Sequence, residues 1–318
     1  LLTSGAIGVG HLRQRAVIAF VSERSGTAQV YLGDVDYLIT MPVSRSGVQN
    51  SDPAWSRQGD LAFVRADADG RDVVVMNMLT RQRCAISGRR LDESSPAWSG
   101  RGELAYVVGS AGRYDLYVQD GCQGNTARNV TRQSSHSVSR PNWSGAGWLV
   151  YDDDVSGTNR IAVINPETLA PIRIRQPEGL NYDGVWFQDR WLAFVSISDQ
   201  NPDVYVYDLS RDELRNVSSH PASDTQPAWS PDGRLAFVSE REGRGDIFVY
   251  DFATGGLTNV TGSPAADMMP AWSPDGRLIY ASSSGTVYDI FLIDQVPGGE
   301  PRLILSSPAQ DYSPVWMP

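Results

Sequence analysis

The chain has 318 residues, and 41% of them are hydrophobic, so it can build a substantial core and does not resemble an intrinsically disordered protein. Its 27 basic and 37 acidic residues give a net charge of −10, which argues against general affinity for nucleic acid or for an anionic membrane surface. Every basic residue is an arginine, and this excludes a lysine nucleophile, a Schiff base and a P-loop lysine.

Three histidines and two cysteines offer little for a zinc site or a Cys/His dyad, and we expect no cofactor. No apolar run approaches the roughly 18 residues of a membrane-spanning helix. The chain begins at Leu1, and we expect residues 1–12 to form an N-terminal extension and residues 13–318 to form one domain.

The sequence is dominated by a repeat of 43 to 45 residues marked by tryptophan. The repeated residues are Trp55, Trp98, Trp143, Trp186, Trp229, Trp272 and Trp316. Five of them follow proline and then Ala or Val, as in Pro227-Ala228-Trp229. A large ring at one register of every unit is typical of packing between units, so we interpret these tryptophans as structural.

Each unit reads as four short antiparallel strands, because alternating β-branched and aromatic runs are separated by turn residues such as Ser230-Pro-Asp-Gly233. In each of seven successive units, three further strands are predicted to follow the strand that carries the tryptophan. In chain order these lie near residues 16–43, 61–86, 103–131, 147–175, 190–217, 234–261 and 277–305.

Four-stranded units of this length are the signature of propeller blades, so the sequence predicts an all-β, seven-bladed β-propeller. The first stretch lacks its own Pro-x-Trp strand, whereas Pro314-Val315-Trp316 lacks a following hairpin. We therefore expect the C-terminal strand to pair with the N-terminal blade and close the ring, which also hides edges prone to aggregation.

The phrase Pro-Ala-Trp-Ser-Pro-Asp-Gly-Arg-Leu, with Asp246-Ile-Phe-Val-Tyr-Asp251 downstream, resembles the WD40-like repeat of the TolB propeller family. The resemblance extends from about Ala16 to Trp316. It implies the propeller fold and an extracytoplasmic location, periplasmic, cell-surface or secreted. It departs from TolB in having seven expected blades, where TolB is understood to have six, and no preceding α/β domain.

Acidic residues recur five positions before the tryptophans, in the loops expected to enter the innermost strands. The residues at this position are Asn50, Glu93, Val138, Asn181, Asp224, Asp267 and Asp311. Glu93, Asp224, Asp267 and Asp311 either form an acidic binding mouth around the axis or cap their own turns in solvent.

Apolar side chains stand beside these acids, at Tyr182, Met268, Met269 and Tyr312. Tyrosine and methionine suit adaptable contact with another protein, and inward packing against the neighbouring blade is the alternative.

Two enzyme classes were weighed against this interpretation. Some WD40-like propellers, the oligogalacturonate lyases, are understood to hold a catalytic metal with several histidines, but only His136 and His220 lie in suitable loops here. A prolyl-oligopeptidase-like hydrolase would need a Gly-x-Ser-x-Gly elbow, which the chain lacks.

Cys84 and Cys122 fall in neighbouring units, so they form either a disulfide between blades or two separate thiols. The function predicted from the sequence is a non-catalytic scaffold that binds a protein partner, within a larger envelope or surface assembly, through one loop face. The alternative is a carbohydrate-active or other metal-dependent, lyase-like enzyme that works in the central channel.

Overall fold

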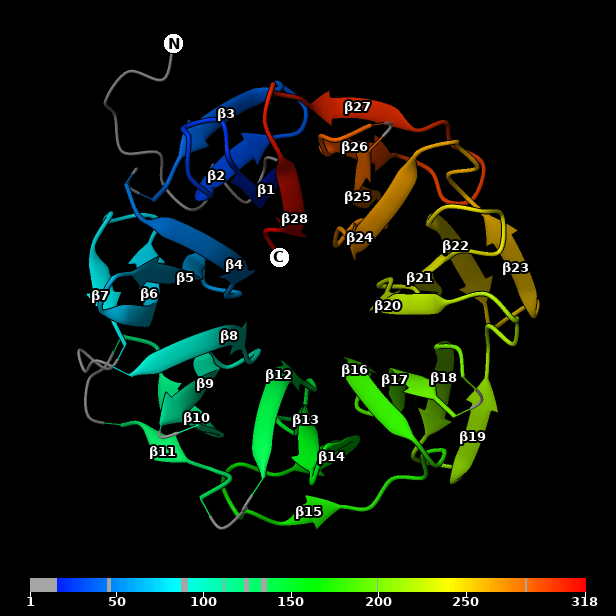
Figure 1. Cartoon of the computed structure of the whole chain (residues 1–318), viewed down its shortest axis with the longest axis horizontal. Coiled ribbons are helices and arrows are strands. Elements are labelled where there is room, and N and C mark those ends of the chain that lie inside the picture. The colour runs from blue at the N-terminus through cyan, green and yellow to red at the C-terminus, as the bar shows by residue number, and fades with distance from the viewer. Residues whose placement is uncertain are drawn as a thin grey trace.

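The structure is a computed structural model that describes residues 16–44, 47–86, 91–110, 112–122, 126–132, 136–198, 200–283 and 285–318. In these residues 28 strands form seven four-stranded antiparallel sheets arranged around a common axis, and there is no helix (Figure 1). The predicted seven-bladed propeller is confirmed. The expected extension, residues 1–12, lies outside the described part of the chain.

Each blade places one strand nearest the axis and three strands successively farther out (Figure 1). The innermost strands, from blade 1 to blade 7, are β28 (Asp311–Trp316), β4 (Gln49–Trp55), β8 (Asp92–Trp98), β12 (Ser137–Trp143), β16 (Leu180–Phe187), β20 (Asp224–Trp229) and β24 (Ala266–Trp272). The second strands are β1 (Val17–Ser22), β5 (Asp60–Asp67), β9 (Glu103–Ser110), β13 (Leu149–Val155), β17 (Trp191–Ile197), β21 (Leu235–Ser239) and β25 (Leu278–Ser283).

The third strands are β2 (Gln29–Asp34), β6 (Gly70–Asn77), β10 (Arg113–Asp120), β14 (Thr158–Ile164), β18 (Asp203–Asp208), β22 (Asp246–Asp251) and β26 (Asp289–Ile293). The outermost strands are β3 (Ile39–Pro42), β7 (Arg83–Ala85), β11 (Arg128–Asn129), β15 (Pro171–Ile172), β19 (Glu213–Asn216), β23 (Gly256–Asn259) and β27 (Arg302–Leu305).

The two chain ends close the ring in blade 1, as the sequence predicts. Strand β28 pairs antiparallel with β1, with Trp316 opposite Ile18 and Asp311 opposite Ser22. The amide of Met317 donates to the carbonyl of Val17 at 3.0 Å and extends this pairing beyond the strand. The last strand therefore completes a blade whose other three strands come from the start of the propeller.

The hydrophobic core lies between blades, because strands alternate their side chains to the two faces of each sheet. One cluster joins Val17 and Leu32 of blade 1 to Leu61 and Phe63 of blade 2. The other clusters join neighbouring blades in the same way, so each blade is stable only against its neighbours.

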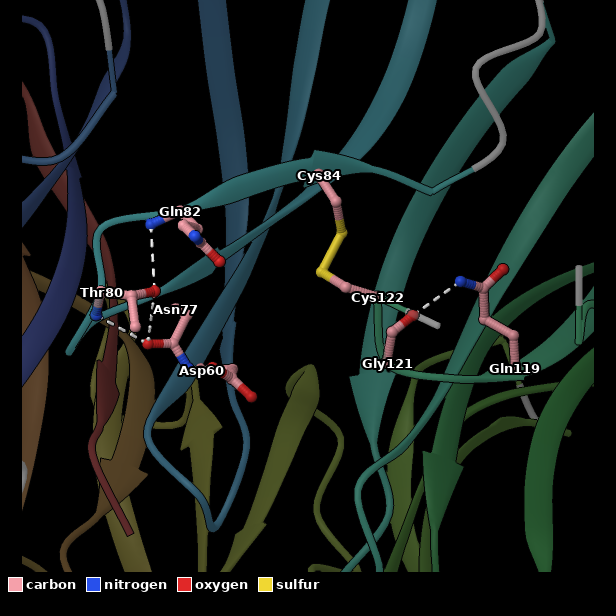
Figure 2. The surroundings of a disulfide bond; sticks show 8 residues. All are labelled: Asp60, Asn77, Thr80, Gln82, Cys84, Gln119, Gly121 and Cys122. Atoms are coloured by element: carbon pink, nitrogen blue, oxygen red, sulfur yellow. Dashed lines mark hydrogen bonds between the residues drawn. A yellow bond between two sulfur atoms is a disulfide. The ribbon is translucent and has the colours of Figure 1, made fainter. Parts of the chain in front are cut away.

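The two cysteines form a disulfide between blades 2 and 3, one of the two arrangements that the sequence left open. Cys84 lies in β7 and Cys122 in the turn after β10, with their Cα atoms 6.0 Å apart. Figure 2 shows Gln119 donating to the carbonyl of Gly121, beside Cys122, at 2.7 Å. This covalent link spans a seam that side-chain packing, hydrogen bonds and an ion pair between Arg71 and Asp92 also hold.

Candidate functional site

Every innermost strand contains a β-bulge at the same place, between the residues four and one positions before its tryptophan. The residue three positions before the tryptophan has a positive φ of 48–62° in all seven strands. We call these seven residues the axial ring: Asp52, Ser95, Arg140, Asp183, Gln226, Met269 and Ser313. Left-handed backbone in non-glycine residues is uncommon, and bulges re-aim the side chains of a strand.

The acidic residues five positions before the tryptophans are buried, which corrects the sequence-based expectation. Glu93, Asp224 and Asp311 are 0% exposed, and Asp267 is 1% exposed. They neither form a charged mouth around the axis nor cap turns in solvent. Their side chains lie before the bulge and are buried, so they are closed to a partner in this conformation.

Two of these carboxylates are held by an arginine from the same short motif. Arg241 donates to both oxygens of Asp224 at 3.1 and 3.2 Å, and it also donates to Ser239 at 2.7 Å. Arg24 donates to Asp311 at 2.9 Å and to Ser22 at 2.7 Å. Each arginine follows a Ser-Glu dipeptide at the end of the second strand, so the same ion pair occurs within blade 6 and across the joined chain ends of blade 1.

The other two carboxylates accept hydrogen bonds from a backbone amide and from a hydroxyl. Glu93 accepts a hydrogen bond from the backbone amide of Val73 in the preceding blade at 2.8 Å. Asp267 accepts one from the Ser263 hydroxyl at 3.3 Å, and burial raises the pKa of its carboxyl. Where blades 1 and 6 have Ser-Glu-Arg, the sequence of blade 7 reads Ser282-Ser-Ser284.

The tyrosines and methionines expected at the loop face lie at the bulges and are partly buried. Met268 and Tyr312 pack against the apolar cluster between blades 7 and 1, which matches the inward-packing alternative. Met269 belongs to the axial ring, where its amide donates to Gln226 at 2.6 Å and its sulfur accepts from the Ser313 amide at 3.3 Å.

Tyr182 takes part in the most highly charged part of the ring, in blades 4 and 5. The Arg140 guanidinium lies 5.5 Å from the centre of the Tyr182 ring and donates to Asp152 at 2.8 Å. Arg140 is 53% exposed, whereas Asp152 is 1% exposed. The second oxygen of Asp152 accepts from the amide of Asp183 at 3.0 Å, so this carboxylate supports two neighbouring members of the ring.

Burial sets the protonation of this cluster. It raises the pKa of Asp152 to about 6, against the opposing effect of the Arg140 guanidinium. Burial likewise raises the pKa of Asp183 and of Tyr182. The ring presents the half-exposed Arg140 guanidinium, paired with Asp152, beside the partly buried hydroxyl of Tyr182, an arrangement that can donate to a carboxylate or a backbone carbonyl.

The axial ring was missed by the sequence reasoning, although a signal for it exists. Proline or glycine stands two positions before each tryptophan, at Pro53, Pro96, Pro141, Gly184, Pro227, Pro270 and Pro314. Proline cannot donate to a strand ladder, so a proline inside each innermost strand marks a bulge. The axial ring follows from that bulge, at the residue three positions before each tryptophan.

The tryptophans pack between blades, as the sequence predicts, and five of them also donate a hydrogen bond to the preceding blade. The indole N–H of Trp272 donates to the carbonyl of Ala228 in the preceding blade at 3.1 Å. Equivalent bonds of 2.9–3.2 Å run from Trp98, Trp143, Trp229 and Trp316.

The histidines weighed as metal ligands stand in different blades. His136, before β12, has its Nδ1 3.2 Å from Asp153, and His220, before β20, accepts from the amide of Ala222 at 3.1 Å. Among the residues that the structure describes, no three His, Cys, Asp or Glu side chains are grouped so that they could hold a metal ion. The same residues contain no helix that is long and apolar enough to cross a membrane.

These features define a seven-bladed β-propeller with a ring of bulged innermost strands. The model of the TolB beta propeller domain family matches residues 103–318, more than half of the chain, and the chain belongs to that family. No curated protein matches the chain in sequence.

Solved structures share the fold at low sequence identity. TolB from Acinetobacter baumannii superposes with a TM-score of 0.61 and 20% identity, over 92% of this chain and 79% of that chain. Oligogalacturonate lyase from Vibrio parahaemolyticus has a TM-score of 0.63 and 15% identity, over 91% of this chain and 85% of that chain.

A puromycin-hydrolyzing peptidase from Mycobacterium tuberculosis has a TM-score of 0.71 and 13% identity, over 92% of this chain and 54% of that chain. The chain therefore spans about half the length of that peptidase. The fold is common to a TolB protein and to two kinds of enzyme, so it leaves the activity of this chain open.

Proposed function

We propose that this chain is a non-catalytic interaction module that binds a protein partner on the face where the innermost strands begin. The observation that carries the proposal is the sevenfold bulge, which places one half-buried or exposed side chain per blade, that of the axial ring, around one axis. A rigid ring of this kind offers a preorganised surface, so little conformational freedom is lost when a partner binds.

The contacts would come from side chains of the axial ring and their neighbours. Met269 and Tyr182 supply adaptable apolar area, while Arg140 supplies an exposed charge. Asp224, Asp267, Asp311 and Glu93 have a different role in this proposal, because they are buried and hold the strands that carry the ring.

An extracytoplasmic location, and a place in a larger envelope or surface assembly, are part of the same proposal. Membership of the TolB propeller family supports both. The disulfide between Cys84 and Cys122 supports the location, because such bonds persist in oxidising compartments.

The test introduces at the bulge of two blades the residues that occupy the same positions in another blade. Blade 6 carries Thr225-Gln226 there, so the double variant Tyr182→Thr with Met269→Gln should keep the fold while changing the ring. Leu79→Ser, an exposed residue in the hairpin between β6 and β7, is the control.

Each protein would be used to recover partners from native envelope extracts. The proposal expects at least a tenfold loss of one specific partner with the double variant and full recovery with the control. Full recovery with the double variant would contradict it.

The competing function, a metal-dependent lyase, is supported by the structural similarity to oligogalacturonate lyase. It predicts a metal in the purified protein that is lost, together with activity on acidic oligosaccharides, when His136 and His220 are changed to alanine. A metal content unaffected by both changes would remove it.

A further inference from the structure

Blade 2 of the propeller contains a cavity at a place that most blades fill with an aromatic ring. Across the second and third strands, seven residue pairs occupy the same register. They are Phe20–Tyr31, Phe63–Val74, Tyr106–Tyr117, Tyr151–Ala162, Phe194–Tyr205, Phe237–Phe248 and Tyr280–Phe291.

In five of these blades both members are aromatic, and their ring centres lie 5.8–6.3 Å apart. In two blades an arginine covers the pair: Arg24 lies 5.0 Å from the ring centre of Tyr31, and Arg241 lies 4.7 Å from that of Phe248. A pair of rings beneath a guanidinium is thus an arrangement that this fold uses repeatedly.

Blades 2 and 4 lack the second ring. In blade 4 Tyr151 stands opposite Ala162, and it belongs to the same apolar cluster as Val138. At the register of Val138, blade 2 has the polar residue Asn50. Blade 2 therefore lacks both the ring and this apolar replacement.

A cavity of about 490 Å³ occupies this part of blade 2. It is lined by Val48, Asn50, Phe63, Arg65, Val74, Arg83, Cys84 and Ala85. Phe63 is 2% exposed and Val74 8% exposed, so the cavity reaches the core. Its size falls in the range of roughly 300–1,000 Å³ that is usual for small-molecule sites.

The charge of the lining is unusual for this acidic protein. Among the described residues that line the cavity, two carry a guanidinium group and none carries a carboxylate. Arg65 is ion-paired with Asp67, which is not part of the lining, and Arg83 donates to the carbonyl of Val43. A guanidinium carries five N–H donors in a planar fork that matches the two oxygens of a carboxylate.

We propose that this cavity is a binding site for a small aromatic carboxylate. The ring of the ligand would take the place of the missing second ring, beside Phe63 and over Val74, and reproduce the cross-strand pair of the other blades. Its carboxylate would be bound by Arg83 and Arg65, since guanidinium and carboxylate form strong, directional pairs. This site is separate from the axial ring, and it does not depend on the function proposed above.

The proposal is tested with the intact protein and 3-phenylpropionate as the probe, with binding measured by isothermal titration calorimetry. The uncharged 3-phenylpropanol has the same ring and chain length. We expect saturable, one-to-one binding of the carboxylate and at least tenfold weaker binding of the alcohol.

Val74→Phe restores the aromatic pair found in five blades, so it should fill the cavity without lowering the melting temperature and should abolish binding. Arg83→Gln should keep the cavity. It should weaken binding of the carboxylate at least fivefold and leave binding of the alcohol unchanged. Leu79→Ser, in the adjoining hairpin, should leave binding unchanged.

Absence of saturable binding to the wild-type protein would overturn the proposal, as would equal affinity in Val74→Phe. If Val74→Phe fails to fold, the alcohol and the Arg83→Gln variant still test the proposal. Equal affinity of the wild-type protein for acid and alcohol would overturn it. Unchanged affinity of Arg83→Gln for the acid would overturn it as well.

Discussion

At the scale of single residues, burial of carboxyl groups governs how this protein responds to pH. The pKa of Asp152 rises from 3.8 to about 6 on folding, so its protonated form is favoured in the folded state. Its contribution to stability is complete below pH 4 and is lost as the pH rises through 6. Asp208 behaves oppositely, because its hydrogen bond with Arg190 lowers its pKa. The ionised Asp208 carboxylate therefore stabilises the folded state above pH 4, and this stabilisation is lost as the pH falls further.

The first prediction concerns the variant Asp152→Asn. Between pH 4 and 6.5 the Asp152 carboxyl should cost the wild-type protein on the order of 3 kcal/mol of unfolding free energy, and the variant should lose that part of the pH dependence. Urea denaturation at a series of pH values measures this. An identical pH dependence in both proteins would contradict the assignment.

The residue scale is also where the sequence was least informative. The acids five positions before the tryptophans are conspicuous in the sequence, and their burial depends on the bulge that follows them. A one-residue change of register moves a side chain to the other face of a sheet, so the exposed positions could not be placed until the bulge was recognised. The proline or glycine two positions before each tryptophan was the available clue.

At the scale of strands, the tryptophans connect each blade to the one before it. Trp272 donates its indole N–H to Ala228, whereas the indole nitrogen of Trp186 is buried without a hydrogen-bond partner among the described residues. The two tryptophans occupy the same register, so they form a matched pair for measuring how much the indole hydrogen bond contributes to stability.

We therefore predict that Trp272→Phe lowers the free energy of unfolding by about 1 kcal/mol more than Trp186→Phe. Both substitutions remove similar ring area, but only the first leaves a carbonyl without its donor. Chemical denaturation of the two variants provides the comparison. Equal losses would show that the hydrogen bond contributes nothing beyond packing.

The strands were readily predicted because each unit repeats its alternation of apolar residues and its turn residues seven times. The first and last residues of the outermost strands were harder to predict. Strands β11 and β15 contain two residues each, too few for a period of two to be visible. Their positions are fixed by pairing with β10 and β14.

At the scale of the whole molecule, the ring depends on the joining of its two ends. Asp311 of β28 is bound by Arg24, and Asp224 is bound in the same way by Arg241 within the continuous chain of blade 6. Removing one partner of a buried ion pair leaves an uncompensated charge, so Arg24→Ala and Arg241→Ala should each cost about 3 kcal/mol.

The location of the damage should differ between these two variants. In Arg24→Ala the amides of β28 should exchange with solvent at least tenfold faster than in wild type, because β28 is the last strand and can detach. In Arg241→Ala they should keep their protection. Hydrogen exchange measured by mass spectrometry distinguishes these outcomes, and unchanged protection of β28 in Arg24→Ala would contradict the role of this pair in closure.

The disulfide is a second constraint on the whole ring. Cys84 and Cys122 are 38 positions apart, and a bond closing a loop of that size restricts the unfolded chain by roughly 4 kcal/mol. Changing both residues to serine should lower the free energy of unfolding by 2–4 kcal/mol, roughly, in urea titrations. No change in the midpoint would show that the disulfide adds nothing to the non-covalent contacts of the seam.

Photo-crosslinking tests the central functional claim, that the partner contacts the ring of bulged strands, most directly. A photoreactive residue would be placed at position 269 in the axial ring and, separately, at position 79 in the exposed hairpin of blade 2. The account predicts a crosslink to one envelope protein from position 269 and none to it from position 79. A crosslink to that protein only from position 79 would contradict it, as would no partner at position 269.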